Sequence, residues 1–107
     1  MVKFSRSNKN PILIQNEKSS WEARAAFNPS VVFNGKKYYM LYRAVSTPQE
    51  RQGFNLEISS IGCAEGTSYD SFKIRKQLIQ PEFYWEAFGC EDPRITKLDD
   101  KYYIFYT

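Results

Sequence analysis

The sequence contains no histidine, and only two of its 107 residues are cysteine. Without histidine, the chain cannot itself supply the Ser-His or Cys-His pairs that activate many catalytic nucleophiles. Cys63 and Cys90 lie far apart and outside any CxxC spacing, so the sequence predicts neither a disulfide nor a zinc site. We expect two reduced, buried thiols, no metal site and a cytoplasmic location.

Long hydrophobic runs and an excess of one charge are missing as well. No segment reaches the roughly 20 apolar residues that a membrane-crossing helix needs, and residues 1–10 lack the apolar core of a secretory signal. The 15 basic and 12 acidic residues are interspersed, which leaves a net charge of +3 and no basic cluster. Neither a membrane nor a nucleic acid is therefore expected as a partner.

Aromatic side chains, by contrast, are abundant. Tyr and Phe occur eight times each, and aromatic residues make up 17% of the chain, which favours β structure. Strands are predicted over residues 30–33 and 37–44, joined at Asn34-Gly35, a dipeptide that favours a type I′ turn with positive φ at both residues. Both faces of the strand at 37–44 are largely apolar, so we expect this strand to be covered on both sides, with Arg43 as the polar exception.

Further strands are predicted on either side of this hairpin. Residues 58–64 and 71–75 are typical of a second hairpin, and the apolar run within residues 10–16 is interpreted as an initial strand. The polar segment 46–57, which contains Pro48 and Gly53, is interpreted as an insertion loop.

The sequence nearly repeats itself. Asn28-Pro29 and Asp92-Pro93 each open a strand–turn–strand segment, and one offset of 64 residues aligns the two segments without a gap from Asn28 to Asp92 and from Tyr42 to Tyr106. Self-similarity at such a period is typical of stacked or radial β architectures. We therefore expect Asn28 and Asp92 to occupy matching points of successive units and to face one shared site.

Antiparallel four-stranded units that repeat along the chain, each buried on both faces, indicate β-propeller blades. The predicted fold class is all-β, of β-propeller type, a fold that needs roughly four to eight blades to close its ring, and this chain supplies about one and a half of them. Residues 1–107 would form a single partial domain, with the first blade over about residues 28–80 and the start of a second over about 90–107. A small β-sandwich or an open meander is the alternative.

The densest group of polar side chains surrounds Asp92. Glu91 precedes it, and Arg94 follows two residues later, where it would share a side with Asp92 once the strand has begun. Pro93 is expected to hold Asp92 in extended backbone. The simpler interpretation of this Glu-Asp-Pro-Arg segment is a turn closed by a surface ion pair.

Two further polar residues are candidates for a site. Asn28 also fits an ordinary Asn-Pro turn before a strand. Arg43 ends an apolar strand face, and a buried guanidinium requires a carboxylate or a polar ligand, for which Glu22 or Glu91 would serve. Several aromatic residues could stack on a sugar or belong to the core: Trp21, Phe27, Tyr84, Trp85 and Phe88.

Six segments, in this order, resemble the N-terminal part of the β-mannoside phosphorylases of glycoside hydrolase family 130. The resemblance covers nearly the whole chain, from about Asn10 to Thr107. The segments are Asn10-Pro11-Ile12-Leu13; Trp21-Glu22 with Phe27-Asn28-Pro29; Leu41-Tyr42-Arg43-Ala44; Ile61-Gly62-Cys63-Ala64; Gly89 to Ile95; and Tyr102 to Thr107.

The resemblance implies a five-bladed propeller with a sugar site at the mouth of its central funnel. It makes Asp92 the general acid, acting on the glycosidic oxygen through a hydroxyl of the bound mannose. Asn28 and Arg43 would hold the mannosyl unit, with Glu91 and Arg94 beside them. Inorganic phosphate would be the co-substrate, with no other cofactor, and would invert the anomeric carbon to give α-mannose 1-phosphate.

The resemblance also implies what these residues lack. In the family the phosphate is held by basic residues of later blades, so we expect the 107 residues alone to be inert. Phosphorolysis of β-1,4-mannooligosaccharides or mannosyl-glucose is the activity implied, and a β-mannoside hydrolase, a non-catalytic carbohydrate-binding or assembly module, and a truncated product without function remain alternatives. The linkage, the acceptor sugar and a homo-oligomeric state stay open.

Overall fold

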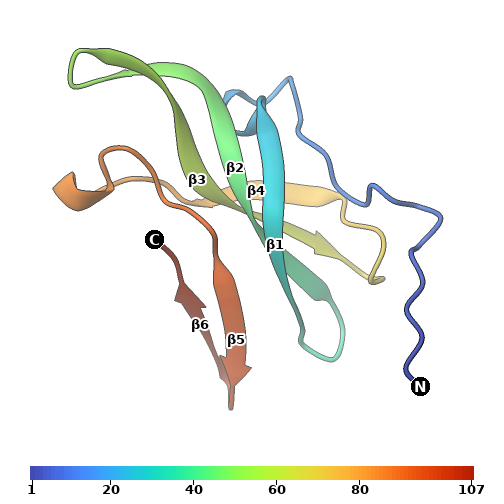
Figure 1. Cartoon of the computed structure of the whole chain (residues 1–107). Helices are drawn as coiled ribbons and strands as arrows, with labels where there is room; N and C mark the ends of the chain where they lie inside the picture. The colour runs from blue at the N-terminus through green and yellow to red at the C-terminus, as the bar shows by residue number, and fades with distance from the viewer.

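The computed structural model describes all residues from 1 to 107, and they form two antiparallel sheets (Figure 1). The first sheet has four strands in chain order: β1 (Ala25–Phe33), β2 (Tyr38–Arg51), β3 (Phe54–Gly66) and β4 (Ile74–Ile79). The second consists of β5 (Arg94–Leu98) and β6 (Lys101–Phe105). A sheet of four strands followed by one of two confirms the predicted all-β fold and its count of about one and a half blades.

Helical structure is limited to two short turns, η1 (Ser20–Glu22) and η2 (Tyr84–Glu86). Each contains three residues, and neither is long or apolar enough to cross a membrane.

The segment predicted to be an insertion loop, 46–57, is instead the extended end of the β2–β3 hairpin. Pairing continues from Pro48↔Glu57 to Arg51↔Phe54, and the two residues between the strands, Gln52 and Gly53, both have positive φ, 51° and 83°. That is the backbone of a type I′ connection. Pro48 suggested a loop because it has no N–H, but it stands at a register shift of the ladder, where proline is tolerated.

The Asn34-Gly35 hairpin is present, although its turn is not the predicted one. Only Gly35 has positive φ, 95°, and the Asn34 side-chain oxygen accepts hydrogen bonds from the backbone N–H groups of Lys36 (2.9 Å) and Lys37 (2.7 Å). The Asn34 side chain therefore closes a longer connection.

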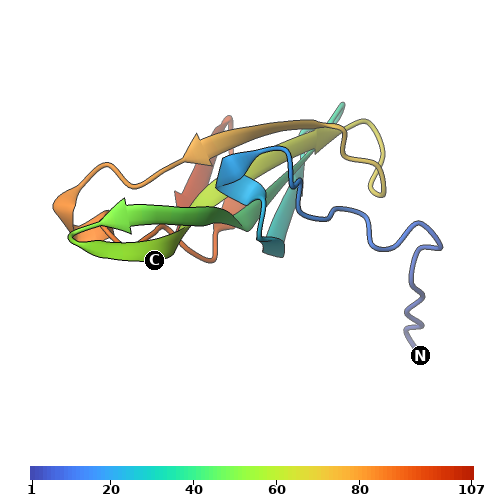
Figure 2. The ribbon, with the colours of Figure 1, turned by 90° about the horizontal axis from the view of Figure 1, so that it is seen from above.

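The initial strand predicted within residues 10–16 is wrong, because this segment joins no sheet. Its contribution is made by side chains: Ile12 and Leu13 pack against the buried cluster on one face of β2. The residues that precede this segment, at the N-terminus, extend away from the sheets (Figures 1 and 2).

Strand β2 is covered on both faces, as its sequence predicted. One face contributes Met40, Tyr42 and Ala44 to a cluster that is closed by Ala64 and Phe72. On the other face, Leu41 packs with three further buried residues, Ile61, Cys63 and Cys90, and Ile95 and Ile104 of the second sheet close the cluster. Docking of the second sheet on this face places the β4–β5 connection beside Arg43.

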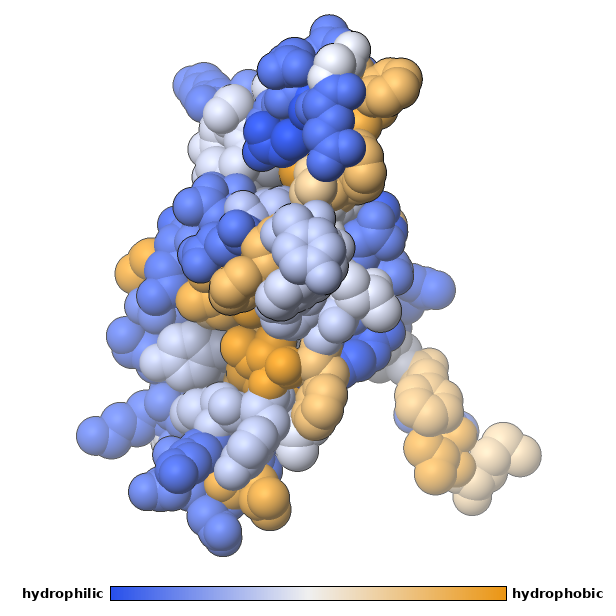
Figure 3. All heavy atoms as spheres, turned by 90° about the vertical axis from the view of Figure 1, so that its left-hand side faces the viewer, coloured by the Kyte–Doolittle hydropathy of each residue, from blue (hydrophilic) through white to orange (hydrophobic).

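The molecule is less compact than a closed domain of its size. Its radius of gyration is 15.0 Å, against about 13 Å for a compact chain of this length, and only 17 of 107 residues are buried. Leu98, Tyr103 and Phe105 of the second sheet are all exposed, and Figure 3 shows apolar groups in the middle of the face that carries this sheet. The second sheet thus presents surface that a complete blade would cover.

Candidate functional site

The backbone of the connection that carries Glu91 and Asp92 is attached to β3 at a single residue, Ser59. The N–H of Cys90 donates to the carbonyl oxygen of Ser59 at 2.9 Å, and Gly89 forms an isolated parallel bridge with Ser59. Gly89 has φ of 142°, and a Cβ there would lie 3.3 Å from Ser59 atoms. Glycine therefore allows the close approach that brings Asp92 over the sheet.

A buried carboxylate, Glu86, orders the same connection from the other side. It accepts hydrogen bonds from the N–H of Glu82 (3.0 Å) and of Phe83 (3.4 Å) and from the hydroxyl of Tyr106 (2.7 Å). The Glu82 N–H, followed by the Tyr106 hydroxyl, lowers the pKa of Glu86, while the same hydroxyl bond raises the pKa of Tyr106 to about 12. Burial raises the pKa of the neighbouring Cys90 thiol to about 11.

Asn28 and Asp92, the residues matched by the repeat, contact each other. The Asn28 side-chain amide donates to Asp92 Oδ1 at 2.6 Å. Their backbones match too, with φ of 50° at Asn28 and 51° at Asp92. Asn28 lies where one extra residue of β1 forms a bulge between Phe27 and Ser30, a common device for redirecting a side chain. The repeat therefore brings two equivalent bends together at one point.

The predicted extended backbone at Asp92 is wrong, since positive φ places this residue in the left-handed region. Asn and Asp are the residues other than glycine that tolerate this region best, which explains why this pair occupies the two bends. Strain of this kind is concentrated at functional sites.

Arg43 joins the Asn28–Asp92 pair from β2, and each nitrogen of its guanidinium faces a different partner. Nε donates to Ser59 Oγ at 2.8 Å, and Nη2 donates to Glu91 Oε1 at 2.9 Å. Nη1 forms an ion pair with Asp92 Oδ1 at 3.6 Å. The guanidinium carbon also lies 5.1 Å from the centre of the Phe27 ring, a cation–π distance. Arg43 is therefore held from four directions.

Arg94 lies outside this network, although the sequence placed it beside Asp92. Its guanidinium donates to the carbonyl oxygen of Pro93 at 2.8 Å, and the ion-pair partner of Asp92 is Arg43 instead. The structure thus brings together four of the predicted residues, Asn28, Arg43, Glu91 and Asp92, which we call the Asp92 cluster. Of the two acids that were expected to pair with Arg43, Glu91 does so; Glu22 is buried and bonded to Tyr42 and Arg75.

Two serines beside these four residues were not predicted from the sequence. Ser59 is bonded to Arg43, and Ser30 Oγ accepts the N–H of Ile95 at 3.0 Å, which links β1 to β5. Ser30 could have been found, since it follows Asn28-Pro29 and the same offset aligns it with Arg94. Ser59 has no such signal, because its role depends on the diagonal placement of β2 and β3.

The aromatic candidates separate into three environments. Trp21 stacks on Tyr42 in the core with ring centroids 6.3 Å apart, and Phe27 lies beside Arg43. Tyr84, Trp85 and Phe88 are exposed at or beside η2, and none of them touches the Asp92 cluster through a hydrogen bond or ring contact.

The cluster leaves one carboxylate oxygen free for chemistry. Both contacts to Asp92 are made through Oδ1, and the side chain is 42% exposed. Glu91 offsets the charge of Arg43, and Oδ2 of Asp92 has no hydrogen-bond or ion-pair partner within the chain. An acid so placed can exchange a proton with a bound hydroxyl group.

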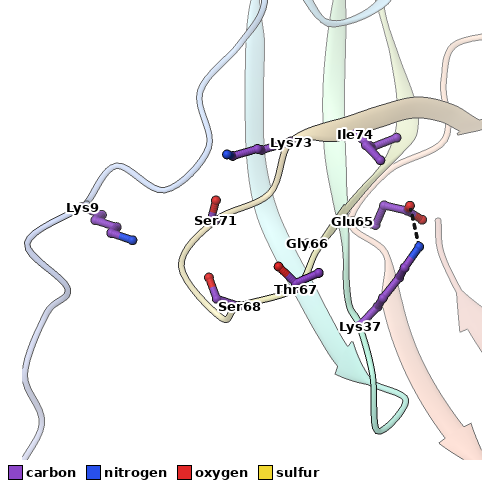
Figure 4. Close-up of a pocket in the computed structure, with 9 residues that line it drawn as sticks. All are labelled: Lys9, Lys37, Glu65, Gly66, Thr67, Ser68, Ser71, Lys73 and Ile74. Atoms are coloured by element: carbon purple, nitrogen blue, oxygen red, sulfur yellow. Dashed lines mark hydrogen bonds and ion pairs between the residues drawn. The ribbon is translucent and has the colours of Figure 1, made fainter.

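A hollow of about 380 Å³ beside the β3–β4 turn is a different feature (Figure 4). Lys9, Lys37 and Lys73 line it together with hydroxyl groups. Two of these lysines are already paired, Lys37 with Glu65 at 3.3 Å and Lys9 with Asp70 at 3.5 Å. None of the residues of the Asp92 cluster lines this hollow, and we assign no role to it.

Known proteins resemble this chain over its whole length. A β-1,2-mannobiose phosphorylase of Thermoanaerobacter sp. (strain X514) is 37% identical over 100% of this chain and 37% of its own length. A 1,2-β-oligomannan phosphorylase of the same strain is 32% identical over 100% of this chain and 36% of its own length. The chain thus spans little more than a third of these relatives.

Solved structures agree with the fold. A glycosyl hydrolase from Bacteroides ovatus superposes with a TM-score of 0.77 and 27% identity, covering 95% of this chain and 33% of that protein. A structure from Parabacteroides distasonis ATCC 8503 gives a TM-score of 0.71 at 24% identity over 95% of this chain and 34% of that protein. The glycoside hydrolase family 130 model, described as β-1,4-mannooligosaccharide phosphorylase, matches residues 3–107, and the chain belongs to that family.

Proposed function

We propose that this chain provides the general acid and part of the mannosyl site of a β-mannoside phosphorylase. The observation that carries the proposal is the Asp92 carboxylate, which is held at Oδ1 by Asn28 (2.6 Å) and Arg43 (3.6 Å) and has no partner within the chain at Oδ2. Family membership and two phosphorylase relatives support it.

The proposed reaction exchanges one glycosidic bond for one phosphate ester. The bond between the anomeric carbon and the acceptor oxygen breaks, and a proton that originates at Asp92 ends on that oxygen. A phosphate oxygen bonds to the anomeric carbon from the opposite face, which gives α-mannose 1-phosphate. Because phosphate arrives as an anion, the second carboxylate that an inverting hydrolase uses to activate water is not required.

Within this reaction, Glu91 serves Arg43 rather than the substrate. Its carboxylate is bonded to Arg43 Nη2 at 2.9 Å, and its backbone N–H and carbonyl oxygen pair with Thr107 at 2.7 and 3.0 Å. Arg94 is assigned a place beside the substrate without a contact to Asp92. The substrate linkage is the finer part of the proposal: the two relatives act on β-1,2-linked mannosides, whereas the family description names β-1,4-linked ones.

A chimera tests the proposal, because the chain spans about a third of its relatives. Residues 3–107 would replace the matching part of the β-1,2-mannobiose phosphorylase, and mannose 1-phosphate would be measured with β-1,2- and β-1,4-mannobiose, with and without phosphate. We expect phosphate-dependent product from the chimera, none from the 107 residues alone, and a loss of at least about a hundredfold in kcat with Asp92→Asn. Arg94→Gln is the matched control and should retain more activity than Asp92→Asn.

Three results would contradict the proposal. Free mannose released without phosphate would identify a hydrolase, an Asp92→Asn chimera with full activity would remove Asp92 from the chemistry, and turnover by the isolated chain would show that no further blades are needed.

A further inference from the structure

We propose that Ser59 is a positioning residue for the Asp92 cluster. Its side chain orients Arg43, and its backbone holds the segment that carries Asp92. The catalytic meaning of this inference rests on the proposed function, whereas the geometry on which it stands does not.

The side-chain half concerns Arg43 Nε. Ser59 is 4% exposed, and its Oγ accepts the Nε–H at 2.8 Å. With Nε held there, the two remaining nitrogens face Glu91 (2.9 Å) and Asp92 (3.6 Å). A guanidinium is planar, so fixing one edge fixes the directions of the others. Removal of the Ser59 hydroxyl would leave Nε without its acceptor, and the orientation of the Arg43 guanidinium toward Asp92 would no longer be fixed.

The backbone half concerns the β4–β5 connection. The carbonyl oxygen of Ser59 accepts the Cys90 N–H at 2.9 Å, two residues before Asp92. Gly89 lies so close that an added Cβ would be 3.3 Å from the Cβ, N and O atoms of Ser59. Ser59 therefore determines the position of both Arg43 and Asp92, and a larger side chain at position 59 would separate them.

Sheet geometry explains why this position rather than its neighbour can act. Arg43 is paired with Ile61, and Ser59, two residues away on β3, has its side chain on the same face. Ser60 is equally buried, at 2% exposed, but it faces the other side, where its Oγ accepts a hydrogen bond from the Gln77 side-chain amide at 3.1 Å. Ser60 is thus a matched control: a buried serine with one side-chain bond and no contact with the cluster.

The direct test is nuclear magnetic resonance of the arginine Nε–Hε groups in the unmodified 107-residue chain, with Arg43 assigned by the signal lost in Arg43→Lys. Arg51 and Arg94 are internal references, since their hydrogen bonds are made through Nη1. We expect the Arg43 Hε to exchange with water at least about tenfold more slowly than theirs, as a hydrogen bond to a charged group predicts. Equal exchange would overturn the proposal before any serine variant is made.

The variants then separate the serine from the rest of the fold. Ser59→Ala should remove most of this protection and shift the Asn28 side-chain amide signal, which reports on Asp92, while Ser60→Ala should leave both unchanged. Retained Arg43 protection in a folded Ser59→Ala chain, or equal loss in both variants, would contradict a positioning role.

Activity of the chimera gives the catalytic readout. Ser59→Ala is expected to lower kcat by about tenfold with a smaller change in KM, and Ser60→Ala to stay within about twofold of the parent. A folded Ser59→Ala chimera with full kcat would overturn the catalytic part. A parent chimera without phosphorolysis would count against the proposed function alone, because the exchange measurement would still decide the position of Arg43.

Discussion

Replacement of Glu22 should destabilise the protein by an amount that depends on whether the new residue can accept a hydrogen bond. This carboxylate is 1% exposed and accepts the Tyr42 hydroxyl at 2.7 Å and Arg75 Nη1 at 3.2 Å. In Glu22→Ala the buried Tyr42 hydroxyl would lose its acceptor, which costs about 1–3 kcal/mol. Arg75 keeps the carbonyl oxygen of Ile14 at 2.7 Å, so its share is below about 1 kcal/mol.

These contributions sum to about 1–4 kcal/mol for Glu22→Ala. Glu22→Gln keeps an oxygen for the Tyr42 hydroxyl and loses only the charge, so we expect about 1 kcal/mol. Tyr42→Phe should cost about 1–3 kcal/mol, and the double variant Glu22→Ala/Tyr42→Phe should cost less than the sum of the single changes, because both remove the same bond.

The assay is urea unfolding followed by tryptophan fluorescence, since Trp21 stacks on Tyr42 and reports on this part of the core. Equal destabilisation by Gln and Ala would refute the reasoning, as it would mean that the charge rather than the acceptor matters. Strict additivity in the double variant would likewise show that Glu22 and Tyr42 act independently.

Two further predictions concern the core and its titration. Gly62→Ala should lower the free energy of unfolding by about 2–4 kcal/mol, because a Cβ at Gly62 would collide with the Tyr42 ring. Gly53→Ala is the control, since Gly53 has positive φ but open space around it, and it should cost only about 1 kcal/mol. Equal losses in urea unfolding would contradict this account. Burial raises the pKa of Cys90 to about 11 from 9.0, so the folded state holds the thiol proton more tightly than the unfolded state does. The resulting contribution to the free energy of unfolding is fully present below pH 9 and is lost as the pH rises toward 11. Cys90→Ala should therefore reduce the fall of the unfolding free energy between pH 9 and 11, and an unchanged slope would contradict the role of Cys90.

Much of the fold follows from local sequence patterns. The apolar faces of β2 and the offset of 64 residues predicted the covered strand and the meeting of Asn28 with Asp92, because alternation and repetition are properties of the chain itself. The extension of β2 was missed because Pro48 is a loop residue by preference, and only the partner strand shows that it stands at a bulge.

The candidate site was predictable only in part, for a similar reason. Asp92 and Arg43 could be identified as polar residues in an unusual setting, whereas Ser59 acts through a diagonal contact between strands and a carbonyl group that any residue would supply. The left-handed backbone of Asp92 also contradicts the usual effect of a following proline and reflects the tertiary contacts around it.

The proline that follows Asn28 has a consequence for chemical ageing. Asparagine deamidates when the backbone nitrogen of the next residue attacks the side-chain amide, and proline has no N–H for this step. Conversion of Asn28 to aspartate would place two carboxylates at the 2.6 Å contact that an amide now bridges. Pro29 therefore preserves the amide donor on which the orientation of Asp92 depends, while the exposed Asn34-Gly35 turn, which lacks this protection, can age without touching the cluster.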